Sequence, residues 1–221
     1  MARPRGNYAV TAARRASIIQ AALEIFGQSG YSGSSLRQVA EVVGMTEAGI
    51  LHHFGSKGNL LIEVLQTRDD KSSEFIPPDI VDPLAFVTGW LRLVEYNVSQ
   101  PGIVELYTKL SAEATAVDHP AHKHFMDRYK YVSGFNVGYF DLLRQHGMLS
   151  SSVSSRVLSV SLIAISDGLQ IQWLLDPEVN IFEELSNFFE SVLTPEAWLQ
   201  VNQALNLSER ETLDSYLVQL A

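Results

Sequence analysis

Apolar residues between positions 34 and 61 recur at the three- and four-residue spacing of an α-helix, in two short groups separated by Gly44. The first group shares one helical face and consists of Leu36, Val39, Ala40 and Val43. The second group is shorter, with Ile50 and Phe54 one turn apart. Each pattern therefore predicts a short helix that buries one face and leaves the other free.

The polar residues around these two groups favour helix ends at defined positions. Ser35 and Gln38 have the spacing of a capping box, in which each side chain binds a backbone N–H of the other residue. Gly44 can adopt the left-handed conformation that ends a helix, and Thr46 is a good N-cap for the second helix. Helix, glycine turn and second helix together predict a helix-turn-helix, whose second helix enters the major groove of DNA.

The same segment resembles the DNA-binding domain of the TetR family of transcriptional regulators. The residues that carry the resemblance are Ser34 and Ser35, Val39 and Ala40, the turn Gly44-Met45-Thr46, and the run His53-Phe54-Gly55-Ser56-Lys57 with Leu60. The resemblance implies an all-α fold, with an N-terminal three-helix helix-turn-helix domain and a larger helical domain that binds a ligand and dimerises. It also implies a ligand-responsive regulator, most often a repressor, that binds a palindromic operator in double-stranded DNA as a homodimer.

Two residues depart from the family pattern. Leu51 stands where the family usually has a tyrosine that contacts phosphate, and Gly58 stands where it usually has glutamate. We expect His52 or His53 to take over the missing phosphate contact. Gly58 lowers the helix propensity of its position by about 1 kcal/mol relative to alanine.

The residues expected to contact DNA lie on the two short helices and at the start of the next one. They are Ser34, Ser35, Arg37, Thr46, Glu47, Ala48, Gly49, His52, His53 and Lys57. Ala48 can touch a thymine methyl group, and Gly49 allows a close approach of the backbone. Lys57 can give an ammonium and a backbone N–H to a phosphate, at the positive end of its helix.

Helical spacing continues through the rest of the chain. It predicts helices over residues 11–28, from Ser56 onward, and over 83–99, 102–116, 120–145, 152–175 and 181–192, with two short helices after Pro195. Three prolines in residues 76–83 interrupt this series, and no stretch alternates like a strand, so we predict an all-α fold. The expected domains are a flexible basic arm (1–13), the helix-turn-helix domain (14–60) and a ligand-binding and dimerisation domain (61–221). The extension over residues 195–221 has no predicted function.

Arg3 and Arg5 lie in the expected arm, which has no apolar periodicity. The arm is either an untethered terminus without a role or a basic segment that reaches phosphate or an adjacent minor groove. The sequence leaves both interpretations open.

Charge is unevenly divided along the chain. Residues 1–68 contain seven Lys and Arg against four Asp and Glu, a net charge of +3. The remaining residues contain nine against 21, a net charge of −12, which together give the overall −9. A basic end beside an acidic bulk is the asymmetry expected of a protein that reads DNA sequence.

Composition narrows the remaining classes of protein. The chain has no cysteine, which excludes disulfides and thiolate metal sites, and we expect no cofactor. No Ser-His-acid set, glycine-rich phosphate loop or paired-carboxylate signature is present, which argues against an enzyme. The most apolar stretch, residues 157–175, is interrupted by serine, aspartate and glutamine. We therefore expect a cytoplasmic protein with no membrane partner.

Aromatic residues recur along residues 120–145, and the family resemblance implies that such helices enclose a small, mostly apolar ligand whose identity the sequence does not give. The residues expected to line the site are Trp90, Tyr107, Phe125, Tyr129, Asn136, Gln170 and Trp173. Most aromatic residues of this stretch are expected to belong to the hydrophobic core. The polar members would fix the orientation of the ligand.

Residues 157–175 carry apolar residues on two opposite helical faces, so both faces need to be covered. We expect one face, with the following helix, to meet a second copy of the chain in a four-helix bundle. The expected interface residues are Leu158, Leu162, Ile165, Leu169, Phe182, Leu185 and Phe189. Burial of both faces within one subunit is the alternative.

Three histidines, His119, His122 and His124, form the one cluster that suggests a metal. Their spacing matches no zinc pattern, and Asp118 followed by Pro120 is typical of a helix start. A metal-responsive regulator and a helical interaction protein that does not bind DNA are the two alternative functions.

Overall fold

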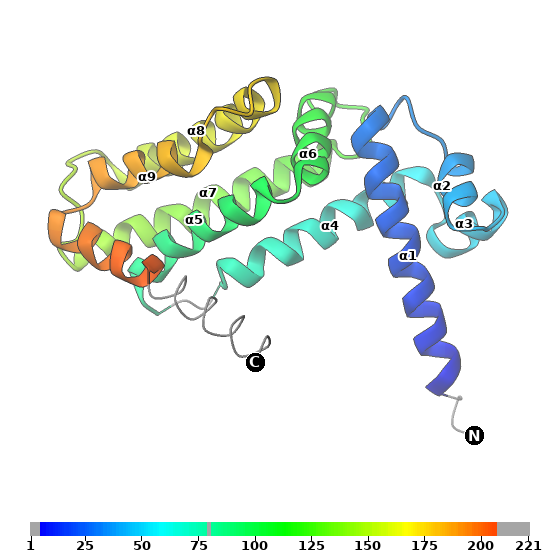
Figure 1. Cartoon of the computed structure of the whole chain (residues 1–221), viewed down its shortest axis with the longest axis horizontal. Coiled ribbons are helices and arrows are strands. Elements are labelled where there is room, and N and C mark those ends of the chain that lie inside the picture. Colours follow the sequence, from blue (N-terminus) through cyan, green and yellow to red (C-terminus); the bar gives the residue numbers. More distant parts are fainter. Residues whose placement is uncertain (1–4, 79–80, 207–221) are drawn as a thin grey trace, which may run out of the picture. The chain divides into compact units, whose positions relative to one another are not determined.

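The computed structural model describes residues 5–78 and 81–206, with side chains from residue 10 onward. Figure 1 shows the helices, which are α1 (Arg5–Ser29), α2 (Leu36–Val42), α3 (Glu47–Phe54), α4 (Lys57–Phe75), α5 (Pro83–Val98), α6 (Pro101–Glu113), α7 (His122–Gln145), α8 (Ser155–Leu175) and α9 (Ile181–Val192). Residues 195–206 are also helical. Over the described ranges the only β contact is an isolated bridge between Leu149 and Leu193, so the predicted all-α fold is confirmed.

Helix α1 begins earlier than its apolar pattern predicts. It starts at Arg5 rather than near residue 11, so residues 5–13 of the expected flexible arm are helical. Arg5, Ala9, Ala12 and Ala13 favour a helix even where apolar residues are not periodic, whereas Gly6 and Asn7 do not, so intrinsic propensity accounts for part of this extension. Residues 1–4, with Arg3, lie outside the described part of the chain, as do Ser208 and Glu211 of the C-terminal extension.

The chain divides into two compact units. The helix-turn-helix unit consists of residues 1–71 and 97–128, and the second unit consists of residues 72–96 and 129–221. The first unit is larger than residues 14–60 because α6 packs against α1 and joins it. Helices α4, α5 and α7 each contribute residues to both units.

A hydrophobic core holds α2 and α3 against α1 and α4 in the helix-turn-helix unit. Its fully or nearly fully buried members are Ile18, Ala22, Phe26, Val39, Ala40, Ile50, Leu60, Leu61, Val64 and Leu65. Burying one such Leu, Ile, Val or Phe side chain contributes about 1.5–3 kcal/mol. This core fixes the relative positions of the two short helices.

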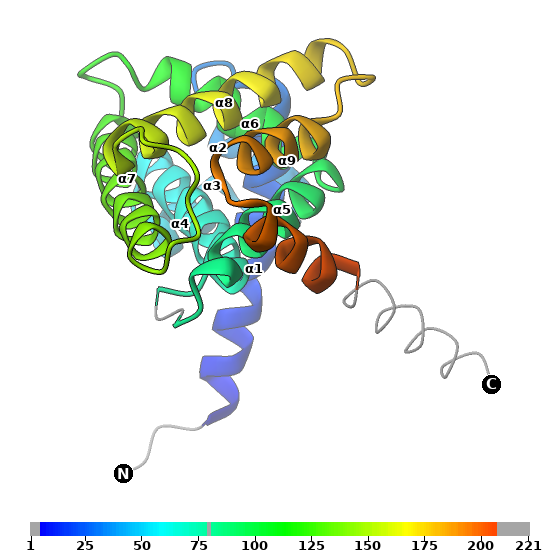
Figure 2. The same cartoon turned by 90° about the vertical axis from the view of Figure 1, so that its left-hand side faces the viewer.

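The second unit packs α5, α7, α8 and α9 around a larger core, in which the ring of Phe86 stacks on Tyr139 with centroids 4.9 Å apart. Helices α8 and α9 lie side by side in both views (Figures 1 and 2). The N-caps of these two helices are Ser154 and Asn180, whose side chains accept hydrogen bonds from backbone N–H groups of the first turn.

Helix α8 is long and apolar enough to cross a membrane by length and composition, and 28% of its most apolar window is buried. Its buried stripe belongs to the core of the second unit. Its opposite stripe is exposed.

Candidate DNA-binding surface

Helix α2 has the predicted capping box. The backbone N–H of Gln38 donates to the Ser35 hydroxyl at 3.3 Å, and the Ser35 N–H donates to the Gln38 side chain at 2.7 Å. Gly44, at φ 65°, follows the helix in the left-handed conformation that a residue with a side chain rarely adopts. The hydroxyl of Thr46 then accepts from the N–H of Gly49 at 3.1 Å and caps α3.

Helix α3 presents one face to the core and the other to solvent. Ile50 and Phe54 are 0% and 7% exposed, whereas Glu47, Ala48 and His52 are exposed. A helix anchored on one side by two large apolar residues keeps its outer face available for a groove of DNA. The structure therefore supplies the geometry that the helix-turn-helix pattern predicts.

Most residues expected to contact DNA lie together on α2, α3 and the turn between them. Those with exposed side chains are Ser35, Arg37, Thr46, Glu47, Ala48 and His52. Gly49 and His53 are half-buried. Arg37 makes an exposed ion pair with Glu41 at 3.0 Å, one helical turn away.

Ser34 and Lys57 are turned into the unit instead. The Ser34 side chain is 8% exposed, and its hydroxyl donates to the carbonyl of Tyr31 at 2.8 Å. The Lys57 ammonium donates to the carbonyls of Tyr31 and Ser34, the second at 2.6 Å. It also lies 4.2 Å from the centroid of the Tyr31 ring. The Ser34 hydroxyl and two of the three N–H groups of the Lys57 ammonium thus bind carbonyls of the unit itself.

Arg15 of α1 is a residue that the sequence reasoning missed. Its guanidinium donates to the carbonyl of His53 at 2.5 Å, lies 4.3 Å from the centroid of the Phe54 ring and pairs with Glu63 at 3.0 Å. One side chain thus joins α1 to the last turn of α3 and to α4. No sequence signal distinguishes Arg15 from its neighbour Arg14, because its three partners are distant in the chain.

The three histidines that suggested a metal have separate partners. A ring nitrogen of His122 lies 2.8 Å from the carbonyl of Ala114, and His124 lies 3.2 Å from Asp69. The ring of His119 packs edge-on against Tyr31 with centroids 5.1 Å apart. Within residues 5–78 and 81–206, no group of three metal-ligating side chains converges. The metal-responsive alternative is therefore not favoured.

The seven residues expected to line a ligand site fall in both units. Tyr107 and Phe125 belong to the helix-turn-helix unit, where their rings lie 4.9 Å apart. The other five belong to the second unit and are Trp90, Tyr129, Asn136, Gln170 and Trp173. The hydroxyl of Tyr129 already donates a hydrogen bond to the carboxylate of Asp167 at 2.7 Å.

Asn136 on α7 is fully buried, and its amide nitrogen and oxygen find no hydrogen-bond partner among the described residues. The indole nitrogen of Trp90 on α5 is also buried and has no hydrogen-bond partner among the described residues. Both belong to the second unit, whose core contains several aromatic rings. A buried amide without partners costs about 1–3 kcal/mol, so such groups call for a physical reason.

Most of the residues expected at a dimer interface are buried within the chain itself. Leu158, Leu162, Leu169, Leu185 and Phe189 are at most 8% exposed and belong to the core of the second unit, while Ile165 and Phe182 are half-buried. The apolar residues of α8 that remain uncovered lie on its other stripe. They are Val157, Val160, Ile171 and Leu175, with 48–82% exposure.

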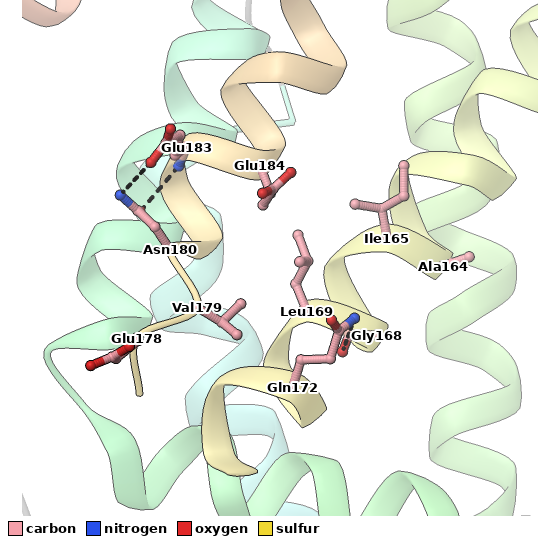
Figure 3. Close-up of a pocket in the computed structure, with 10 residues that line it drawn as sticks. All are labelled: Ala164, Ile165, Gly168, Leu169, Gln172, Glu178, Val179, Asn180, Glu183 and Glu184. Carbon is pink, nitrogen blue, oxygen red and sulfur yellow. Dashed lines mark hydrogen bonds between the residues drawn. The ribbon is translucent and has the colours of Figure 1, made fainter. Parts of the chain in front are cut away.

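A surface cavity of about 620 Å³ lies between α8 and the start of α9. Figure 3 shows Leu169 and Gln172 of α8 on one side and Val179, Asn180 and Glu184 on the other. Its lining mixes apolar side chains, such as Ile165 and Leu169, with polar ones that include Glu178. Two of the residues that line the cavity, Ala164 and Gly168, lie on the exposed side of α8.

Comparison with known proteins agrees with the geometry. Residues 18–64 match the family described as bacterial regulatory proteins, tetR family. The chain is 25% identical over 179 residues to the HTH-type transcriptional regulator TtgR of Pseudomonas putida, covering 74% of this chain and 81% of TtgR.

Solved structures share the fold. A TetR-family transcriptional regulator from Agrobacterium tumefaciens superposes with a TM-score of 0.72 at 18% identity, covering 83% of this chain and all of that one. NalD of Pseudomonas aeruginosa, the secondary repressor of the MexAB-OprM multidrug efflux pump, gives 0.65 at 22% identity, covering 84% and 99%. The helix-turn-helix geometry, the family match and these shared folds lead to one conclusion: residues 18–64 form a TetR-family DNA-binding segment, and the chain has the fold of TetR-family transcriptional regulators.

Proposed function

We propose that this protein is a ligand-responsive repressor that binds a palindromic operator as a homodimer and is released by a small molecule. The observation that carries the proposal is the outer face of α3, which is exposed along its length while Ile50 and Phe54 anchor the helix from behind. The family supports regulation of transcription, and we infer that the protein acts in the cytoplasm.

DNA reading would divide between base contacts and phosphate contacts. Ala48 and His52 on the outer face of α3 would meet base edges, and Gly49 would allow the helix to sit deep in the groove. Arg37, exposed on α2, would contact a phosphate. Leu51 is 40% exposed, so the position at which the family carries a tyrosine is accessible here as well.

Two copies would be needed because one short helix makes too few contacts for a specific site. We propose that they meet through the exposed stripe of α8, formed by Val157, Val160, Ile171 and Leu175. This assignment replaces the stripe expected from periodicity, which the chain already covers with its own core. The cavity beside Gly168 would receive a side chain of the second copy.

We propose Asn136 and Trp90 as the polar groups that recognise the ligand in the second unit. An amide that offers an NH2 donor group and an acceptor oxygen, with an indole N–H as a further donor, suits an uncharged ligand that carries its own acceptors and donor. Aromatic side chains around them would contact its apolar part. Such a ligand would release DNA only to the extent that it binds the DNA-free conformer more tightly.

The experiment that tests the function is selection of bound duplexes from a random DNA pool at about 0.15 M salt, since phosphate-driven affinity depends steeply on salt. Recovery of a palindrome supports a symmetric, sequence-reading dimer and supplies a probe for ligand screening. A folded, dimeric protein that enriches no sequence contradicts the proposal.

The proposed dimer surface has its own test. The 221 residues contain no cysteine, so a single Gly168→Cys substitution is the only thiol in the variant. Oxidation yields a disulfide-linked dimer if the exposed stripe of α8 faces its own copy near that position. The matched variant Gly138→Cys, at an exposed position of α7, gives no such product. Equal cross-linking of both variants contradicts the assignment.

A further inference from the structure

The turn that leads from α1 to α2 is held by side chains that come from α4 and α6. Lys109 of α6 donates to the carbonyls of Gly27 and Gln28, at 3.0 and 3.3 Å. Two carbonyls further along the turn, those of Tyr31 and Ser34, accept from Lys57 of α4. Helix α1 has no basic residue in its own last turn, so the Lys109 ammonium from α6 balances the negative end of its dipole.

Glu113, the last residue of α6, contacts the same turn. Its carboxylate accepts from the Tyr31 N–H at 3.3 Å, and its other oxygen is so close to Gly30 that a Cβ there would lie 2.5 Å from it. Gly30 has φ 67°, which also favours glycine. His119 lies 3.6 Å from the Glu113 carboxylate and covers the Tyr31 ring.

Lys57 and Glu113 therefore act on one short stretch of backbone. Burial lowers the pKa of Lys57, and the negative charge of Glu113 opposes that shift. The Tyr31 ring lies directly under the ammonium, with its centroid 4.2 Å away. Lys57 binds two carbonyls of the turn and Glu113 binds the Tyr31 N–H, so α4 and α6 each hold the turn through a charged side chain.

The clamped stretch determines where α2 begins. Ser34, whose carbonyl accepts from Lys57, directly precedes the N-cap Ser35. Helix α2 in turn packs against α3, which carries the outer face that we assign to the major groove. A shift of the turn would thus move both helices of the helix-turn-helix.

We propose that Lys57 and Glu113 are positioning residues for DNA recognition, and that Lys57 orients the helix-turn-helix through the α1–α2 turn instead of contacting a phosphate. The inference rests on the proposed DNA-binding function and adds to it the means by which the end of α6 controls α2. It distinguishes this lysine from Arg37, whose side chain is exposed.

A positioning role and a phosphate-contacting role of Lys57 predict different salt dependences of DNA binding. They also predict different effects on DNA binding when Glu113 is substituted. Each phosphate contact contributes about 0.9 to the slope of log affinity against log salt. A lysine that only positions the helices raises the affinity for DNA, but its removal leaves the slope of log affinity against log salt unchanged. A carboxylate that only lies near DNA repels it, so its removal would leave binding unchanged or tighter, whereas removal of a positioning carboxylate weakens binding.

The test compares the wild type with Lys57→Gln, Glu113→Ala, the double variant and Arg37→Gln. Asp118→Ala is the matched control for Glu113→Ala, because Asp118 is an exposed acidic residue five positions later. Binding to the selected duplex and to a mixed-sequence duplex is measured over a series of salt concentrations. Circular dichroism reports the melting temperature of each variant.

We expect Lys57→Gln and Glu113→Ala each to lower affinity for the selected duplex about tenfold, the scale on which loss of one charge-assisted hydrogen bond acts. The double variant should resemble either single variant, since both act on one turn. The salt slope should fall only in Arg37→Gln, and Asp118→Ala should bind like the wild type.

Three outcomes overturn the proposal: a reduced slope in Lys57→Gln like that of Arg37→Gln, wild-type affinity in Glu113→Ala, or equal effects of Glu113→Ala and Asp118→Ala. If Lys57→Gln does not fold, Glu113→Ala and its control still decide between the two roles. A wild-type protein that binds neither duplex contradicts the proposed function itself and is thereby distinguished from failure of this inference.

Discussion

The carboxylate of Asp69 on α4 lies 3.1 Å from the guanidinium of Arg128 on α7 and 3.2 Å from a ring nitrogen of His124. The guanidinium of Arg68 lies 3.5 Å from the same carboxylate and 4.1 Å from the centroid of the Tyr107 ring. Three helices of the helix-turn-helix unit, α4, α6 and α7, therefore meet at one largely buried group of charged side chains.

Removal of the carboxylate should destabilise this unit. Asp69→Asn removes a negative charge that lies beside two largely buried guanidinium groups, and we expect a loss of about 2–3 kcal/mol, below the range for a fully buried pair. The exposed pair Arg37–Glu41 provides the control, where Glu41→Gln should cost at most about 0.5 kcal/mol. Urea unfolding measures both, and equal losses would contradict the prediction.

The same group gives a pH dependence with a defined sign. Burial alone would raise the pKa of Asp69, but the hydrogen bond from His124 and the charges of Arg128 and Arg68 outweigh it and hold the pKa below its ordinary value. A carboxyl with a lowered pKa adds stability above its unfolded pKa of about 3.9 and loses it as pH falls through the folded value. Asp69→Asn should therefore differ from the wild type in melting temperature at neutral pH, and the difference should shrink below about pH 4.

Bulk at Gly49 should block the major groove without unfolding the protein. A Cβ at this position would lie 3.1 Å from the terminal methyl of Met45, which is the flexible end of a side chain and can move. Gly49→Ala should bind the selected duplex within about threefold of the wild type, and Gly49→Leu should lose at least about tenfold. Wild-type affinity in Gly49→Leu, measured by fluorescence anisotropy, would show that this face of α3 does not enter the groove.

Restoring a tyrosine at Leu51 should strengthen binding to every sequence alike. Leu51 is 40% exposed, so a phenol there can extend into solvent and donate to a phosphate. One such hydrogen bond to a charged group corresponds to about a tenfold gain. Leu51→Phe is the control, because it adds the ring without the hydroxyl. If both variants gain equally, the hydroxyl makes no phosphate contact.

A charge on the exposed stripe of α8 should separate the dimer. Val160 is 52% exposed in the single chain, and Val160→Glu would place a carboxylate in the proposed interface. We expect a monomer by light scattering at micromolar concentration. Met126→Glu is the matched control, because Met126 is 55% exposed on α7 and should leave the dimer intact.

The unpaired amide of Asn136 should lower the stability of the ligand-free protein. Asn136→Leu keeps the volume and removes two unsatisfied polar atoms, so we expect the free energy of unfolding to rise by about 1–3 kcal/mol. Asn187→Leu, at an exposed position of α9, should change it by less than about 0.5 kcal/mol. A loss of stability in Asn136→Leu would mean that the amide is satisfied by buried water instead.

The helix-turn-helix could be predicted from the sequence because its signals are local. The capping box at Ser35, the left-handed Gly44 and the N-cap Thr46 each depend on residues within one turn, and all three are present. The orientations of Ser34 and Lys57 could not be predicted in this way. Their partners, such as the Tyr31 carbonyl, are set by how separate helices pack.

The larger core shows the same limit of sequence reasoning. Periodicity identifies two apolar stripes on α8, but only the packed structure shows that Leu162 and Leu169 face the chain's own core while Val160 and Ile171 do not. The position of Asn136 among aromatic residues was visible in the sequence. The absence of any partner for it among the described side chains was not.

If two copies meet as proposed, the exposed stripe of α8 would link the lifetime of this protein in the cell to its abundance. A newly made chain would display Val157, Val160, Ile171 and Leu175 to water until it met another copy, and uncovered apolar surface attracts chaperones and proteases. Copies present in small numbers would remain uncovered for longer and be removed faster. Once the protein concentration exceeded the Kd of the dimer, most copies would be paired and protected from removal. The amount of dimer would then rise more steeply than the rate of synthesis.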